Sequence, residues 1–177
     1  MKIYHVIFHL VTYYVAWFAC ILFAANDIPW IGAGIALTIF VLQWVWQKKF
    51  DQTEFLLSFV LMFTLSGFFI DTLFLNLNLI SFHTNPWPIP ISPPWMIMLW
   101  VNFSMLLYTC VRYLFDYPKI LAILSFIGFP MAYFTGTLFG AASLPARNIA
   151  LLGYGVVCGL MLPLIISIHK KLKRNSR

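Results

Sequence analysis

Phe59–Leu79, with the sequence FVLMFTLSGFFIDTLFLNLNL, is the segment from which we interpret the rest of the chain. It is long enough for a transmembrane helix, which needs about 20 predominantly apolar residues. An Asp near the helix centre costs roughly 3 kcal/mol on insertion scales, and each Leu, Ile, Phe or Val returns about 0.3–0.6 kcal/mol. The segment contains thirteen residues of these four types. Their combined gain, on the order of 5 kcal/mol, exceeds the cost of inserting Asp71, so the segment is predicted to insert into the membrane.

Asp71 belongs to a polar stripe along this predicted helix. Seven residues before Asp71 is Thr64, four before it is Gly67, and seven after it is Asn78. These spacings place all four residues on one helical face. A carboxylate inside a membrane faces protein or water and not lipid. The stripe therefore predicts a candidate site on the inner face of this helix.

Composition places the whole chain in a membrane. Of its 177 residues, 62% are hydrophobic and 9% are charged, with a mean hydropathy of +0.90. A soluble domain of this size is nearer half apolar and a quarter charged. We predict an all-α fold, with one transmembrane domain over residues 1–168 and a basic cytoplasmic tail over 169–177. The formal net charge of +6 comes from residues at helix ends and in this tail. This pattern is typical of orientation and contact with anionic lipid, and not of nucleic-acid binding.

Six apolar segments predict six transmembrane helices. They cover residues 3–25, 30–46, 55–80, 95–114, 119–142 and 148–168. With six spans, ten Lys and Arg residues fall on one side and only Arg147 on the other. The side with ten carries Lys2, Lys48, Lys49, Arg112, Lys119, Lys170, Lys171, Lys173, Arg174 and Arg177. The positive-inside rule then predicts that both termini are cytoplasmic.

The predicted outer loop after the third helix, SFHTNPWPIPISPPW (residues 81–95), is rich in proline and tryptophan. Five prolines between residues 86 and 94 predict an extended, stiff segment. We expect Trp87 and Trp95, with Trp30, at the outer headgroup level. The loop is either a lid over an outer-leaflet cavity or an aromatic-anchored connector.

Three later helices extend the candidate site. In the fourth, Trp95, Asn102 and Thr109 share one face, and Asn102 lies about 10 Å deep against about 13 Å for Asp71. In the fifth, Tyr133 and Thr137 lie beside a strip of small residues that recurs every four residues from Gly128 to Gly140. The sixth helix offers a second small-residue strip, and the two strips either pack on each other or admit a ligand.

The predicted ligand-binding set is Asp71, Asn102, Tyr133, Thr137, Thr64, Asn78 and Trp95. The carboxylate could bind or shuttle a proton, and Asn and Tyr can hydrogen-bond either of its forms. The alternative is a structural polar clasp between the third, fourth and fifth helices.

Neither a metal site nor a cofactor site is predicted. The three cysteines lie in apolar segments without a CxxC pattern, which favours buried single thiols. His5 and His9, with His169 on the same membrane side, lack an accompanying acidic motif, so we interpret them as interfacial. The chain has no P-loop, GxSxG, HExxH or dinucleotide fingerprint, and we predict no catalytic residues.

Four motifs resemble a known family. They are AANDIPWIG (24–32), FFIDTLF (68–74), PPWMIMLWVNF (93–103) and GFPMAYFTGTLFGA (128–141). In this order they resemble the bacterial membrane-protein family catalogued as domain of unknown function 2878. The resemblance implies a small bacterial inner-membrane protein whose relatives sit among genes for fatty-acid and lipid modification. It implies no catalytic residues.

Three functions remain open. The first is an accessory membrane protein that binds a lipid or lipid-like molecule in an outer-leaflet polar pocket around Asp71, alone or with a partner membrane protein. The second is a membrane-embedded lipid-modifying enzyme in which Asp71 is the general acid or base and Tyr133 the second group. The third is a substrate-capture subunit of a small-molecule importer, similar to those of energy-coupling-factor transporters. Those use an Ala-x-x-x-Ala strip on helix one near the cytoplasm. Here the strip of small residues lies in the outer half of the helix, at Ala16, Cys20 and Ala24, which weakens this alternative.

Overall fold

The computed structural model describes residues 3–49 and 55–175. These residues form six long helices: α1 (Ile3–Ala25), α2 (Pro29–Lys48), α3 (Leu56–Asn76), α4 (Pro94–Cys110), α5 (Pro118–Leu138) and α6 (Arg147–Asn175). The six predicted apolar segments are thus confirmed as helices. All but α4 are long and apolar enough to cross a membrane. Residues 1–2, 50–54 and 176–177, which include Lys2, Arg177 and part of the predicted loop after the second segment, lie outside the described residues.

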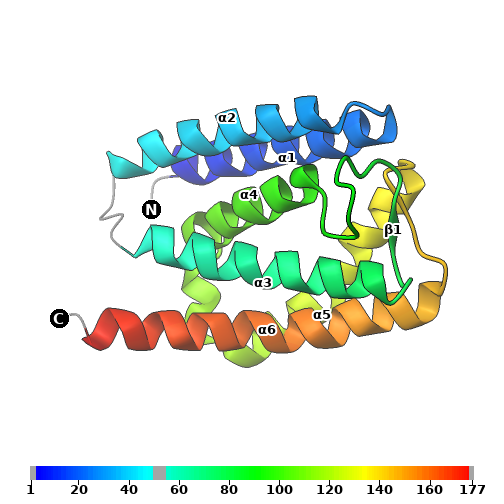
Figure 1. Cartoon of the computed structure of the whole chain (residues 1–177). Helices are drawn as coiled ribbons and strands as arrows, with labels where there is room; N and C mark the ends of the chain where they lie inside the picture. The colour runs from blue at the N-terminus through cyan, green and yellow to red at the C-terminus, as the bar shows by residue number, and fades with distance from the viewer. Residues whose placement is uncertain (1–2, 50–54, 176–177) are drawn as a thin grey trace.

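The short helix α4 occupies the centre of the bundle. It lies between the α1–α2 pair and α3, while α5 and α6 form a second pair (Figure 1). Thirteen of its 17 residues are buried. Pro94 begins α4 in its first turn, and a 3₁₀ helix, η1 (Arg112–Asp116), follows its end. The predicted fourth segment, 95–114, therefore contains a helix that ends four residues earlier.

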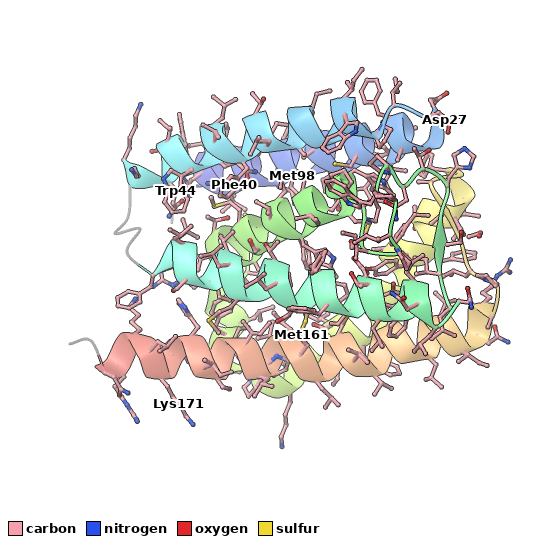
Figure 2. All side chains as sticks on the ribbon, viewed as in Figure 1. Asp27, Phe40, Trp44, Met98, Met161 and Lys171 are labelled. Carbon is pink, nitrogen blue, oxygen red and sulfur yellow. The ribbon has the colours of Figure 1, made fainter. Side chains whose placement is uncertain are left out.

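The ends of the bundle are marked by different segments. α1 begins and α6 ends at the same end (Figure 1). Asp27, in the α1–α2 turn, lies at the opposite end from Lys171 near the end of α6 (Figure 2). The segment predicted as a basic tail is helical as far as Asn175. Lys170 ties this part of α6 to η1, because its Nζ donates to Phe115 O at 2.8 Å and Asp116 Oδ1 at 2.6 Å.

The loop between α3 and α4 is folded and hydrogen-bonded. Two residues of it, β1 (Ser81–Phe82), pair antiparallel with β2 (Ala142–Ser143) of the α5–α6 connection. Further along, Asn76 Nδ2 donates to Pro90 O, and Trp87 Nε1 donates to Ser92 O. Trp95, expected at the headgroup level, is 1% exposed and its Nε1 donates to Thr84 O. The loop thus forms a bent, hydrogen-bonded cap at the end of the bundle that carries the α1–α2 turn.

Close packing of α1 on α2 depends on Gly32. A Cβ atom at Gly32 would lie 2.8 Å from Ala19 O and 2.9 Å from Cys20 Cα, which are backbone atoms of α1. Because backbone cannot rotate away, Gly32→Ala must separate the two helices. We expect it to lower the free energy of unfolding by about 1–3 kcal/mol, as overpacking does. Thermal unfolding in mild detergent measures this loss.

Gly34→Ala is the matched control for this substitution. Gly34 lies on the same helix, and nothing lies within 4 Å of its added Cβ. Its replacement should leave stability unchanged or raise it slightly, since Ala favours helix over Gly. Equal stability of the Gly32→Ala and Gly34→Ala proteins would contradict the packing described here.

Candidate functional site

The Asp71 carboxylate is the centre of a hydrogen-bonded cluster that joins four helices. Asp71 lies on α3 and is 0% exposed. Trp100 of α4 donates from Nε1 to Oδ2 at 2.7 Å. Tyr154 of α6 donates to Oδ1 at 3.1 Å, and Tyr133 of α5 donates to the same oxygen. Three donors therefore compensate the carboxylate for the loss of water.

The rings of this cluster are packed tightly against one another. The rings of Tyr133 and Tyr154 stack with their centroids 3.7 Å apart, and the centroid of the Phe74 ring lies 4.2 Å from that of Tyr154. Gly67 makes room for Trp100, because an added Cβ would lie 2.1 Å from the indole Cδ2. The polar stripe predicted on α3 thus contains a glycine whose role is to admit the indole that binds Asp71.

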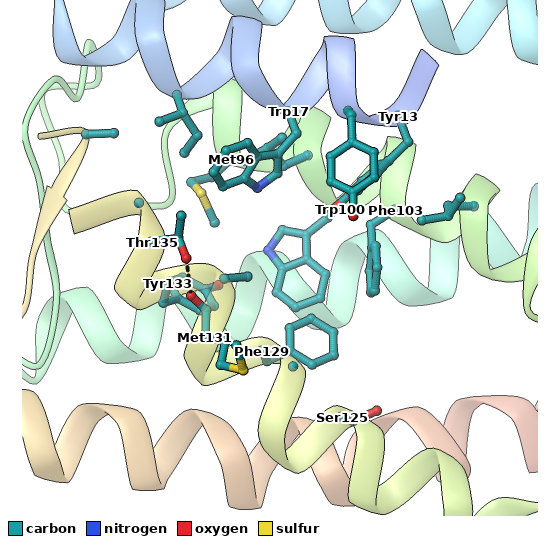
Figure 3. A pocket seen from close by; sticks show the side chains of 18 of the residues that line it. Tyr13, Trp17, Met96, Trp100, Phe103, Ser125, Phe129, Met131, Tyr133 and Thr135 are labelled. Carbon is teal, nitrogen blue, oxygen red and sulfur yellow. Dashed lines mark hydrogen bonds between the residues drawn. The ribbon is translucent and has the colours of Figure 1, made fainter. Parts of the chain in front are cut away.

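A mostly apolar groove of about 600 Å³ lies beside this cluster, between α1, α4 and α5 (Figure 3). Trp100 and Tyr133 line it with their rings. Asp71 is not among its lining residues, because those two side chains stand between the carboxylate and the groove. As far as the chain is described, no charged side chain lines the groove. The pocket is therefore beside Asp71 and not around it.

The small-residue strip of α5 faces this groove. Gly128 and Gly136 are lining residues, and a Cβ added at Gly128 would meet nothing within 4 Å. The glycines of α6 pack on a different part of α5. A Cβ added at Gly155 would lie 2.8 Å from Phe126 O, and one added at Gly159 would lie 3.4 Å from Phe126 Cβ. The two strips do not pack on each other, so the α5 strip leaves open space.

The structure separates the other predicted site residues from Asp71. Asn102 donates from Nδ2 to Ala36 O at 3.0 Å, which ties α4 to α2. Thr137 donates to Phe134 O within its own helix. Trp95 lines the groove. Of the predicted set, Tyr133 alone is hydrogen-bonded to Asp71 in the described part of the chain.

Two residues of the predicted stripe lie apart from the carboxylate cluster. The Thr64 hydroxyl is buried and has no hydrogen-bond partner among the described residues. Asn78 is exposed beyond the end of α3, with a φ of 55°. A role for either residue in ligand binding stays a prediction.

Sequence reasoning missed Trp100 and Tyr154. A signal for Trp100 was present, because it lies mid-segment and far from the interfaces where Trp normally concentrates. A buried indole N–H usually has a partner, and Asp71 was the obvious acceptor. Tyr154, between Gly153 and Gly155, gave no such signal and was not among the predicted residues.

The histidines near the start of α1 are buried against α2. His5 Nε2 lies 2.9 Å from Gln47 Oε1, and Trp46 Nε1 donates to His5 Nδ1 at 3.0 Å. His9 is 0% exposed, and neither ring nitrogen has a partner within residues 3–49 and 55–175. His5 thus ties α1 to α2, and both side chains are buried instead of facing the lipid interface.

The bundle of apolar helices defines a multi-pass helical membrane protein. The chain belongs to the family described as "Protein of unknown function (DUF2878)", whose model matches residues 6–164. The resemblance drawn from the four sequence motifs is confirmed. No curated protein and no solved structure matches the chain.

Proposed function

We propose that this protein binds one lipid or lipid-like molecule in the aromatic groove and serves as an accessory protein in lipid metabolism. The observation that carries the proposal is the construction of the groove wall. Trp100 and Tyr133 both line the groove, and both direct their polar hydrogen away from it to Asp71. Asp71 thereby fixes two ring faces in the orientation that an apolar ligand would contact.

The dimensions of the groove suit a long chain. Its volume lies within the range of about 300–1,000 Å³ typical of small-molecule sites. On α5 the lining extends from Leu121 to Phe139, which is about 27 Å at 1.5 Å per residue. That length is close to the hydrocarbon thickness of a bilayer, about 30 Å.

We place the protein in the bacterial inner membrane with both termini cytoplasmic. The support is the positive-inside rule applied to ten basic residues against Arg147. In this orientation the end of the groove lined by Phe82, Ala141 and Ala142 lies in the outer leaflet. The bent cap between α3 and α4 then closes that end toward the outside.

Native mass spectrometry from mild detergent tests the proposal. The wild-type protein should carry a stoichiometric adduct with the mass of a lipid or lipid-like molecule. Bound lipid in a broad, non-stoichiometric distribution, or bare protein throughout, would count against a specific site.

A lipid-modifying enzyme is the second candidate, and one contact favours it. Tyr133 lines the groove and its hydroxyl donates to Asp71, so the two groups that this candidate requires as general acid or base are hydrogen-bonded to each other at the groove wall. Tyr133→Phe keeps the ring and removes the hydroxyl. If the protein only binds, the adduct keeps its mass in this variant; if it catalyses, the adduct changes to the unmodified substrate.

The strip of small residues on α1 gives the importer alternative no support. Cys20, the middle residue of the small strip on α1, is 0% exposed and its Sγ donates to Gly32 O. Ala16 and Ala24 are also fully buried. The strip is used inside the fold and offers no face to a coupling subunit.

A further inference from the structure

Tyr13 and Trp17 are two of the donors on α1 that line the groove, and neither has a hydrogen-bond partner among the described residues. Tyr13 and Trp17 lie one helical turn apart, and both side chains point toward Trp100 and the α5 wall (Figure 3). Neither the Tyr13 hydroxyl nor the Trp17 Nε1 makes a hydrogen bond to another described residue. The other two groove-lining tryptophans are both satisfied, Trp95 by Thr84 O and Trp100 by Asp71.

The depth of these donors makes their lack of a partner informative. α1 extends from Ile3 to Ala25, so Tyr13 and Trp17 lie within about 5 Å of its middle at 1.5 Å per residue. The hydrocarbon core around the protein supplies no water at that depth to accept a hydrogen bond. Tyr and Trp side chains whose hydroxyl or indole N–H is hydrated are normally found at the membrane interfaces. An acceptor for these two groups must therefore come from whatever fills the groove.

We propose that the ligand is a long-chain lipid with a neutral oxygen function near the middle of its chain, and that Tyr13 and Trp17 donate to that oxygen. This inference rests on the proposed binding function and adds the ligand's chemistry. The oxygen is neutral because the groove offers no charged side chain within the described residues, and a charge at this depth is costly. A keto, hydroxyl or ether oxygen meets these requirements.

The test compares two probes of equal chain length, methyl stearate and its mid-chain keto analogue. Affinities are measured on delipidated protein by native mass spectrometry. The wild-type protein should bind the keto analogue about 10-fold more tightly, as expected for two modest hydrogen bonds. Tyr13→Phe and Trp17→Phe should each reduce the preference to about 3-fold, and the double variant should have none.

Matched controls remove the same groups outside the groove. Tyr113→Phe and Trp44→Phe replace side chains that do not line it, and both proteins should keep the wild-type preference. The readout is a ratio between two probes on one protein, so loss of folded material cancels. Equal binding of both probes by the wild type would overturn the inference but not the proposed function, as would a preference that survives in the double variant. Binding of neither probe would overturn the proposed function and the inference with it.

Discussion

Asp71→Ala should lower the free energy of unfolding by about 2–5 kcal/mol. The substitution leaves the polar hydrogens of Trp100, Tyr133 and Tyr154 without their acceptor inside the bundle. A buried group that loses its partner costs about 1–3 kcal/mol, and hydrogen bonds within membranes average nearer 0.6 kcal/mol. Three such groups on three helices therefore give a loss of several kcal/mol. Denaturant-induced unfolding in mixed micelles measures it.

Asp116→Ala is the matched control for this prediction. Asp116 also accepts a hydrogen bond, from Lys170, but its side chain is 77% exposed. An exposed pair contributes about 0–1 kcal/mol, so this variant should remain close to the wild type. The stability of Asp71→Asn should lie between those of Asp71→Ala and Asp116→Ala. The amide retains one oxygen as an acceptor, but its NH₂ group faces a side-chain donor of the cluster. A loss below 1 kcal/mol for Asp71→Ala would show that the cluster does not stabilise the bundle.

Gly128→Trp should abolish binding of the groove's ligand while leaving the protein folded. The added side chain projects from α5 into the groove, where a Cβ meets nothing within 4 Å. An indole is among the largest groups that a substitution can add, so it would occupy part of the cavity of about 600 Å³ and block it for a long chain. We expect affinity to fall by at least about 10-fold, equivalent to 1.4 kcal/mol. The stoichiometric adduct in native mass spectra reports the loss.

Gly34→Trp controls for the effect of adding an indole to the protein surface. Its Cβ also meets nothing within 4 Å, and Gly34 lies on α2, outside the groove. This variant should retain the adduct at the wild-type level. If the Gly128→Trp protein keeps its adduct, the ligand is bound elsewhere. If both variants lose it, the effect does not report on the groove.

The number and order of the helices followed from the sequence because they depend on local composition. Apolar segments bounded by Pro29, Pro94 and Pro118 mark where helices begin, and each of these prolines stands in a first turn. The burial of Asp71 among polar partners was also predictable, since an isolated carboxylate within an apolar segment requires internal partners. Local rules of this kind need no knowledge of how helices pack.

The composition of the site was only partly predictable because it depends on helix rotation and neighbours. Depth alone placed Asn102 level with Asp71, but the face of α4 that turns to α3 carries Trp100 instead. The α5 glycines form a packing motif in sequence, and only the structure shows that α6 does not cover them and that Gly128 faces open space. The groove itself exists because α1 and α5 do not close on each other across α4.

Photo-crosslinking tests the central claim, that the groove is the binding site, most directly. A long-chain lipid with a diazirine in mid-chain would be bound to the wild-type protein, irradiated and mapped by peptide mass spectrometry. The structure predicts label concentrated on groove-lining residues such as Trp17, Leu124 and Met131, and its loss in the Gly128→Trp protein. Label spread evenly over outward-facing residues such as Leu42 and Leu61, unchanged by Gly128→Trp, would contradict it.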